Sequence, residues 1–163
     1  MNILKTLKRI DVKAFWLLLT LGVQHPLFLY PTYKATKKCM RTATAYFDRK
    51  HYLNGQANAF RHAYWNYAIA KECTYWSKNE DRILQWTKLI TDWHENAFRN
   101  REMARVMDFH NNAIGRALFK EHRTSSLDNI LELLLKMTAQ SVRIRTVMET
   151  TRHPNALVHL KDD

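Results

Sequence analysis

The chain has 163 residues, 46% of them hydrophobic, which is enough to build one domain with a sizeable core. Three Gly and three Pro are too few for the many tight turns of a sheet protein. The formal net charge of +11 limits the classes of binding partner and says nothing about the fold. Nucleic acid, an anionic membrane surface or a phosphorylated substrate would each fit as a partner. The charge could also serve only to keep the protein soluble.

The N-terminal part is basic and apolar. Residues 2–10 place Leu and Ile on one side of a helix and Lys and Arg on the other, which predicts an amphipathic helix. Residues 12–23 predict a more apolar helix, broken by Gly22 and Pro26. The apolar run in it is ten residues long, against the roughly 20 that span a bilayer. A signal peptide also begins this way, but no small-x-small cleavage site follows, so a core or bilayer-surface helix is favoured.

The rest of the chain predicts helices joined by short loops. Pro31 is expected to open a helix that runs to about Phe47, because proline suits the first helical turn. Residues 48–55 read as a loop with a turn at Asn54-Gly55. Further helices are predicted over 56–76, from an Asn79 cap to about Phe98, over 101–121, and from a cap at Ser125 or Ser126 onward.

Towards the C-terminus, residues 140–151 continue the last of these helices or add a short one. The strand-like alternation at residues 141–147 is too brief to build a sheet alone, and Pro154 is expected to end regular structure. The fold class is therefore all-α, a single-domain bundle of six to eight helices with an amphipathic basic N-terminal extension.

Within this one domain we expect three parts. Residues 1–50 are the helical extension, residues 51–153 are the helical core with the polar site, and residues 154–163 are a C-terminal tail. Only two cysteines occur, Cys39 and Cys73, so a disulfide framework is excluded. A single disulfide stays open, but a reducing compartment is the simpler interpretation.

Three short segments hold an unusual density of His, Asn, Asp, Glu and Arg. In the first, Asn58, His62 and Asn66 are spaced four residues apart and so line one face of a helix, with Arg61 beside them. A buried row of this kind is odd for core packing, because each polar group needs a hydrogen-bond partner. The second segment, residues 92–96, places two carboxylates beside the His94 imidazole, which suits metal binding or acid–base chemistry.

In the third segment, Asp108, Asn111, Asn112 and Gly115 share one helix face, whereas His110 projects to a different side. Glycine in a helix costs roughly 1 kcal/mol relative to alanine, which a close helix crossing or a bound ligand would justify. Each segment alone also has a plain structural explanation. Three of them on successive helices can converge in a bundle interior, so we expect one shared polar site.

Candidate roles follow from residue chemistry. The catalytic candidates are His62, His94, Glu95, Asp108 and His110. The candidate ligands for a divalent metal, Zn or another, are His62, His94 and Asp108. The candidate substrate-binding residues are Asn58, Arg61, Asn111, Asn112 and Arg116.

The segments NAFRHAYWN (58–66), DWHEN (92–96) and MDFHNNAIGR (107–116) together resemble a bacterial family of unknown function. Its members show N-A-x-R-H-A-x-W, a later A-H-E or D-H-E, and M-D-x-H-N-N-x-x-G-R. The resemblance covers residues 54–120 and implies that the candidate residues belong to the family pattern. The family occurs as small stand-alone proteins and as terminal modules of secreted, toxin-like proteins. Because this chain carries a basic, apolar extension and no long upstream scaffold, a toxin role is in doubt.

These residues favour a hydrolase acting on a phosphoester, including a phospholipid at an anionic membrane. A metal would activate water, and Arg61 and Arg116 would clamp the phosphate. A metal-free variant uses His62 or His94 as the base with Glu95 orienting it. No Ser or Cys lies in the three segments, so water is the expected attacker.

Two other classes stay open: a nucleic-acid-binding or nucleolytic module, which the charge and aromatics would suit, and a non-enzymatic helical adaptor in which the cluster is a buried polar network. Cytoplasmic, peripheral-membrane and secreted locations all remain open, as does the oligomeric state.

Overall fold

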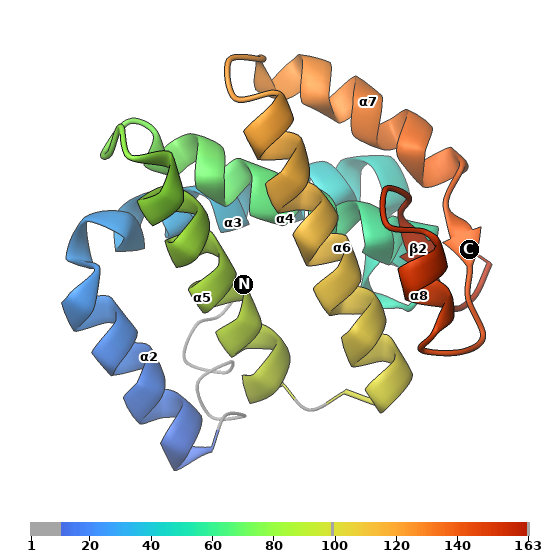
Figure 1. Cartoon of the computed structure of the whole chain (residues 1–163), viewed down its shortest axis with the longest axis horizontal. Helices are drawn as coiled ribbons and strands as arrows, with labels where there is room; N and C mark the ends of the chain where they lie inside the picture. The colour runs from blue at the N-terminus through green and yellow to red at the C-terminus, as the bar shows by residue number, and fades with distance from the viewer. Residues whose placement is uncertain (1–10, 99, 163) are drawn as a thin grey trace.

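The computed structural model describes residues 11–98 and 100–162 and is all-α, as expected (Figure 1). Its described part contains seven α-helices, within the predicted range of six to eight, and a short 3-10 helix at Lys50–Tyr52. The helices are α2 (Val12–Gln24), α3 (Pro26–Phe47), α4 (Gln56–Cys73), α5 (Glu80–Ala97), α6 (Glu102–Glu121), α7 (Leu127–Ala139) and α8 (Glu149–Arg152). The amphipathic helix predicted for residues 2–10 lies outside the described residues.

Helix starts follow the predicted capping chemistry, with one correction. The Asn79 side chain accepts a hydrogen bond from the backbone N–H of Arg82 at 2.9 Å, and Ser126 accepts one from Asn129 at 3.2 Å. The prediction that Pro31 opens a helix is wrong. Pro26 takes the first-turn position, where a missing N–H costs nothing, and Pro31 lies buried one turn further into α3.

Helix α4 is the central element. It packs against α3, α5, α6 and α7, and nearly all of its residues are buried. A helix buried all round needs small residues where neighbours approach, and its alanines supply them. Figure 1 shows α5 and α6 side by side in front of α4, with α7 across one end. The largest side chains in this core are Trp86, Tyr64, Tyr67, Phe28, Phe60 and Phe119.

Regular structure does not end at Pro154, contrary to the prediction. The alternating segment supplies strand β1 (Val142–Arg143), which pairs in parallel with β2 (Val158–His159). Val142 lies opposite Val158 in this two-stranded sheet. Leu157 and Val158 are fully buried, because the chain returns after Pro154 to cover the ends of α4 and α6. The segment expected to be a tail is therefore part of the packed structure.

Helices α2 and α3 meet at His25 with a bend of 115°. Among the described residues no single helix has the length and apolar character to cross a membrane. The bent pair of α2 and α3 has that length and apolar character only when the two helices are taken together. Cys39, on α3, and Cys73, at the end of α4, are both buried free thiols. Burial raises the pKa of each thiol to about 12.

Substitution of Gly115 tests the helix crossing. A Cβ at this position would overlap the carbonyl oxygen of Ala63 and lie 2.9 Å from its Cα, so α6 could not approach α4 as it does. We expect Gly115→Ala to lower the stability by about 3 kcal/mol and the Tm by about 10 °C. Thermal unfolding followed by circular dichroism measures this.

Gly22→Ala is the matched control. A Cβ there meets only the Leu29 side chain at 3.6 Å, an ordinary contact. Alanine should then stabilise α2 by up to about 1 kcal/mol. Equal effects of the two substitutions would contradict a crossing that depends on Gly115.

Candidate functional site

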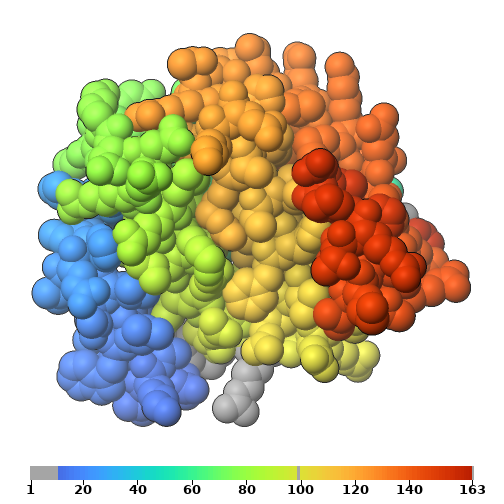
Figure 2. Space-filling view, viewed as in Figure 1, coloured from blue at the N-terminus to red at the C-terminus, as the bar shows by residue number. Residues whose placement is uncertain are grey.

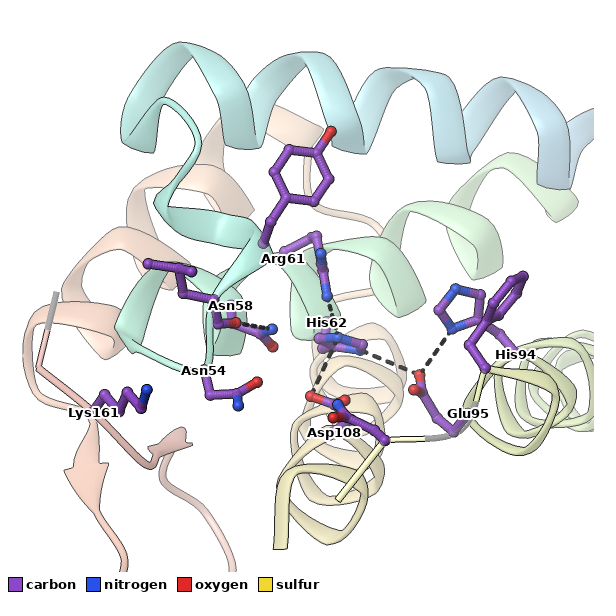
Figure 3. Close-up of a pocket in the computed structure, with 12 residues that line it drawn as sticks. Asn54, Asn58, Arg61, His62, His94, Glu95, Asp108 and Lys161 are labelled. Atoms are coloured by element: carbon purple, nitrogen blue, oxygen red, sulfur yellow. Dashed lines mark hydrogen bonds and ion pairs between the residues drawn. The ribbon is translucent and has the colours of Figure 1, made fainter. Parts of the chain in front are cut away.

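His62 lies at the centre of a buried cluster to which α4, α5 and α6 each contribute one ionisable side chain (Figure 3). Its Nδ1 is 3.3 Å from Glu95 Oε1, and its Nε2 is 3.3 Å from Asp108 Oδ1. All three side chains are about 95% buried or more. The predicted convergence of three segments is therefore present, with one carboxylate at each nitrogen of the ring.

Neighbouring groups fix the tautomer of His62. Nδ1 faces two acceptors, Asn112 Oδ1 at 3.1 Å and Glu95 Oε1, so it carries the proton. At the other nitrogen, Arg61 Nη2 lies 2.7 Å from Nε2. A guanidinium can only donate, so Nε2 accepts in this arrangement and the ring is neutral. Nε2 can also take up a proton and donate to Asp108, which makes it the exchangeable position of the ring.

Charge and burial drive the pKa values of the cluster apart. Burial alone would lower the pKa of His62, but Asp108 and Glu95 outweigh it and raise the pKa above the ordinary value of 6.5. Burial would raise the pKa of Glu95, but His62 and His94 hold it well below its usual range. For Asp108 burial prevails, and its pKa is raised. Environments that move the pKa values of two carboxyl groups apart in this way are typical of acid–base sites.

A layer of amides supports the cluster from inside the bundle. Asn112 donates to Glu95 Oε1 at 2.9 Å and accepts from Asn66 at 2.6 Å. Asn66 Oδ1 in turn accepts from Arg116 at 2.8 Å and from Thr91 at 3.1 Å. Because these partners leave the amides little freedom, they hold Glu95 and His62 in one orientation.

The cluster forms one wall of a cavity of about 370 Å³. Side chains with cationic or amide groups line much of the rest, among them Arg61, Lys161, Asn54, Asn58 and Asn100. His94 borders the cavity between Trp65, 5.1 Å away, and Phe98, 4.8 Å away, and its Nδ1 is 3.4 Å from Glu95 Oε1. Asp108 Oδ1 and Asn58 Oδ1 are buried without a hydrogen-bond partner among the described residues.

Six of the predicted site residues line this cavity: Asn58, Arg61, His62, His94, Glu95 and Asp108. The others do not. His110 contacts the carbonyl oxygen of Ala156 at 2.9 Å, as its position on another side of α6 implies. Asn111 pairs with both backbone groups of Val158 and so fixes β2. Asn112 and Arg116 belong to the supporting amide layer.

The predicted metal set also changes. The three side chains whose ligand atoms lie within 4.8 Å of one another, and which could hold a metal ion, are His62, Glu95 and Asp108. Glu95 takes the place predicted for His94.

Several cavity residues lie in segments that were predicted to be only a loop and a tail. Asn54 and Lys161 meet because the backbone N–H groups of Leu160 and Lys161 donate to Asn54 O at 2.9 and 3.2 Å. The same loop holds Asn58, whose amide donates to Leu53 O. The polar character of Asn54 and Lys161 offered no signal by itself, because a turn and a chain end are polar in most proteins.

Residues 19–142 match the family described as Domain of unknown function (DUF6973). The chain belongs to this family. No curated protein and no solved structure matches the chain. The DUF6973 match is wider than the motif resemblance over 54–120: it includes α3 to α7 and every residue that lines the cavity except Lys161. The bacterial distribution and the toxin-like context of relatives stay predictions.

Asp108→Asn distinguishes a reactive cluster from a purely structural network. Because the folded state raises the pKa of Asp108, ionisation of this group at neutral pH opposes folding. The neutral amide should then raise stability by about 1 kcal/mol at pH 7, or the Tm by about 2–4 °C. The gain should shrink as the pH falls towards the ordinary pKa of Asp. Chemical denaturation at several pH values measures it.

Asn66→Ala is the contrasting substitution. It removes the hydrogen bonds that Asn66 makes with Thr91, Arg116 and Asn112 inside the bundle, so we expect a loss of about 1–3 kcal/mol. If Asp108→Asn destabilised the protein as much as Asn66→Ala, the cluster would be a network that fixes helix register.

Proposed function

We propose that this protein is a hydrolase that cleaves a phosphoester bound in the cavity beside His62. The observation that supports this most is the placement of a buried imidazole between two carboxylates of opposite pKa shift, on the wall of a cavity that also presents Arg61. Such a set supplies a base, an acid and a contact for a negatively charged group.

In the proposed reaction His62 is the general base. Nε2 takes a proton from a water molecule, whose oxygen forms a bond to phosphorus as the bond to the leaving oxygen breaks. The imidazolium that results lies against the Glu95 carboxylate, which lowers its energy. Asp108, which has the higher proton affinity of the two acids, supplies the proton that the leaving oxygen needs.

Phosphate suits the cavity because of the cations along it. Arg61 is partly exposed and can turn its remaining donors towards phosphate oxygens, and Lys161 adds a second positive charge. A phosphate that draws Arg61 from Nε2 frees this nitrogen for the proton. None of the described cavity residues is a Ser, Cys or Thr, so an attacking water fits better than a covalent intermediate on one of these side chains.

The pH dependence of hydrolysis tests the base. Since His62 must be unprotonated to act, kcat/KM should rise with pH, with a midpoint above 6.5. Glu95→Gln removes a negative charge next to the ring, so the pKa of His62 falls and the midpoint moves to lower pH. The rate should also fall about 100-fold, because the imidazolium loses a stabilising partner. A panel of p-nitrophenyl phosphate, bis-p-nitrophenyl phosphate and a short-chain phospholipid provides the substrates.

His62→Asn should lose about 1,000-fold or more of the rate on the best substrate. The control is His122→Gln, which changes a partly exposed imidazole at the far end of α6 and should leave the rate unchanged. No hydrolysis of any ester in the panel, or equal loss in both variants, would overturn the proposed activity.

A metal-dependent version is the second candidate, favoured by the three ligand atoms within 4.8 Å. A divalent ion held by His62, Glu95 and Asp108 would lower the pKa of a bound water. Two features weigh against it. The two carboxylates lie at opposite nitrogens of the His62 ring. The cationic Arg61 lies 2.7 Å from one of these nitrogens, Nε2.

Metal removal separates the two versions. After dialysis against a chelator, the metal-free reaction predicts an unchanged rate and no stoichiometric Zn or Mn by elemental analysis. Loss of the rate, restored by one equivalent of Zn or Mn in the wild type and not in Glu95→Gln, would instead establish the metal-dependent reaction.

A further inference from the structure

Helix α2 carries two apolar stripes, and one of them packs against the other described helices. Ala14, Leu18 and Leu21 face α5, where Trp93 Nε1 donates to Ala14 O at 2.8 Å. The opposite stripe points outward. Its members follow helical spacing and are 73%, 63%, 43% and 81% exposed: Val12, Trp16, Leu19 and Val23.

The start of α3 extends this apolar surface around the bend. Leu27, Leu29, Tyr30 and Tyr33 are exposed there. Together the two helices hold more than half of the large apolar side chains that the described residues expose. Figure 2 shows α2 along one edge of the molecule, beside α5. A contiguous apolar surface of this kind is typical of an interaction site.

The charge of the same two helices identifies the partner. From Val12 to Phe47 the sequence contains five basic residues and no Asp or Glu. Within residues 11–98 and 100–162, one of the five, Lys34, is bound in an ion pair, with Glu72 at 2.9 Å. The others are Lys13, Lys37, Lys38 and Arg41, all exposed. Exposed Trp, Tyr and Leu beside exposed Lys and Arg match the headgroup layer of an anionic bilayer, which takes up both.

We propose that α2 and the first turns of α3 form a lipid-binding surface, with which the protein lies on an anionic bilayer. The outward stripe of α2 enters the headgroup and acyl boundary, and the lysines and Arg41 contact the lipid phosphates. The packed stripe of α2 links this helix to the cavity: Trp93, which donates to Ala14 O, is 6.3 Å from Phe98, and Phe98 lines the cavity.

Taken with the proposed hydrolase activity, on which this step rests, the position points to a lipid phosphoester as the substrate class. Because α2 packs on α5 and the end of α5 lines the cavity, a protein lying on this surface would keep its cavity near the layer in which phospholipid headgroups are found.

Vesicle co-sedimentation of the full chain tests the surface. We expect binding to vesicles of phosphatidylserine and phosphatidylcholine in equal parts to be about 10-fold or more tighter than to phosphatidylcholine alone, and to weaken with salt. Trp16→Ser combined with Leu19→Ser should weaken binding about 10-fold or more. Both side chains are exposed, so the fold should be unaffected.

The matched control is Val147→Ser combined with Met148→Ser, which removes two exposed apolar side chains far from α2 in the sequence. It should bind as the wild type does. Tryptophan fluorescence adds a direct readout: a blue shift on anionic vesicles that disappears in Trp16→Phe, while co-sedimentation persists, places Trp16 in the lipid.

Other occupants of the surface give different results. A full chain that ignores anionic vesicles, or that binds equally well in Trp16→Ser/Leu19→Ser, overturns the lipid surface. A dimer that dissociates in this variant would indicate a second copy of the chain instead. Hydrolysis of a soluble diester is measured separately, so failure of the lipid surface and failure of the proposed hydrolase are distinguishable.

Discussion

The close crossing of α4 and α6 at Ala63 and Gly115 is the contact on which the site depends. Glycine lets the backbone of α6 approach the carbonyl of Ala63, which is next to His62 in the chain. At this separation Asn112, one turn before Gly115, reaches His62 Nδ1 and Glu95, and Asp108, a further turn away, reaches Nε2. The entropic cost of a helical glycine is therefore offset by an arrangement that a larger residue would prevent.

Once the helices are at this distance, electrostatics determines how the cluster behaves. Two buried carboxylates would repel each other strongly, but the imidazole and Arg61 lie between or beside them. The two carboxylates are not stabilised equally by their neighbours. Glu95 Oε1 accepts a hydrogen bond from Asn112 and lies 3.3 and 3.4 Å from the imidazoles of His62 and His94, whereas Asp108 Oδ1 has no hydrogen-bond partner in the described structure. This asymmetry gives the two acids different proton affinities and leaves Nε2 as the position where a proton can be exchanged.

Much of this could be predicted from the sequence, because the signals are local. Helical periodicity and the caps at Asn79 and Ser126 located α5 and α7, and the four-residue spacing of Asn58, His62 and Asn66 indicated a polar face on α4. The features that could not be predicted depend on how the segment after Pro154 packs back against the domain. The pairing of β1 with β2 and the approach of Lys161 to Asn54 come from contacts between distant segments. Pro31 was misread because proline in a second turn is rarer than in a first.

The most direct test of the account is the titration of His62 by NMR, using the ¹⁵N shifts of its imidazole nitrogens. We predict that at high pH the proton is on Nδ1, that Nε2 titrates with a pKa above 6.5, and that this pKa falls in Glu95→Gln. A proton on Nε2 in the neutral form, or a pKa near 6.5 that ignores Glu95→Gln, would contradict the arrangement of charges on which the proposed chemistry rests.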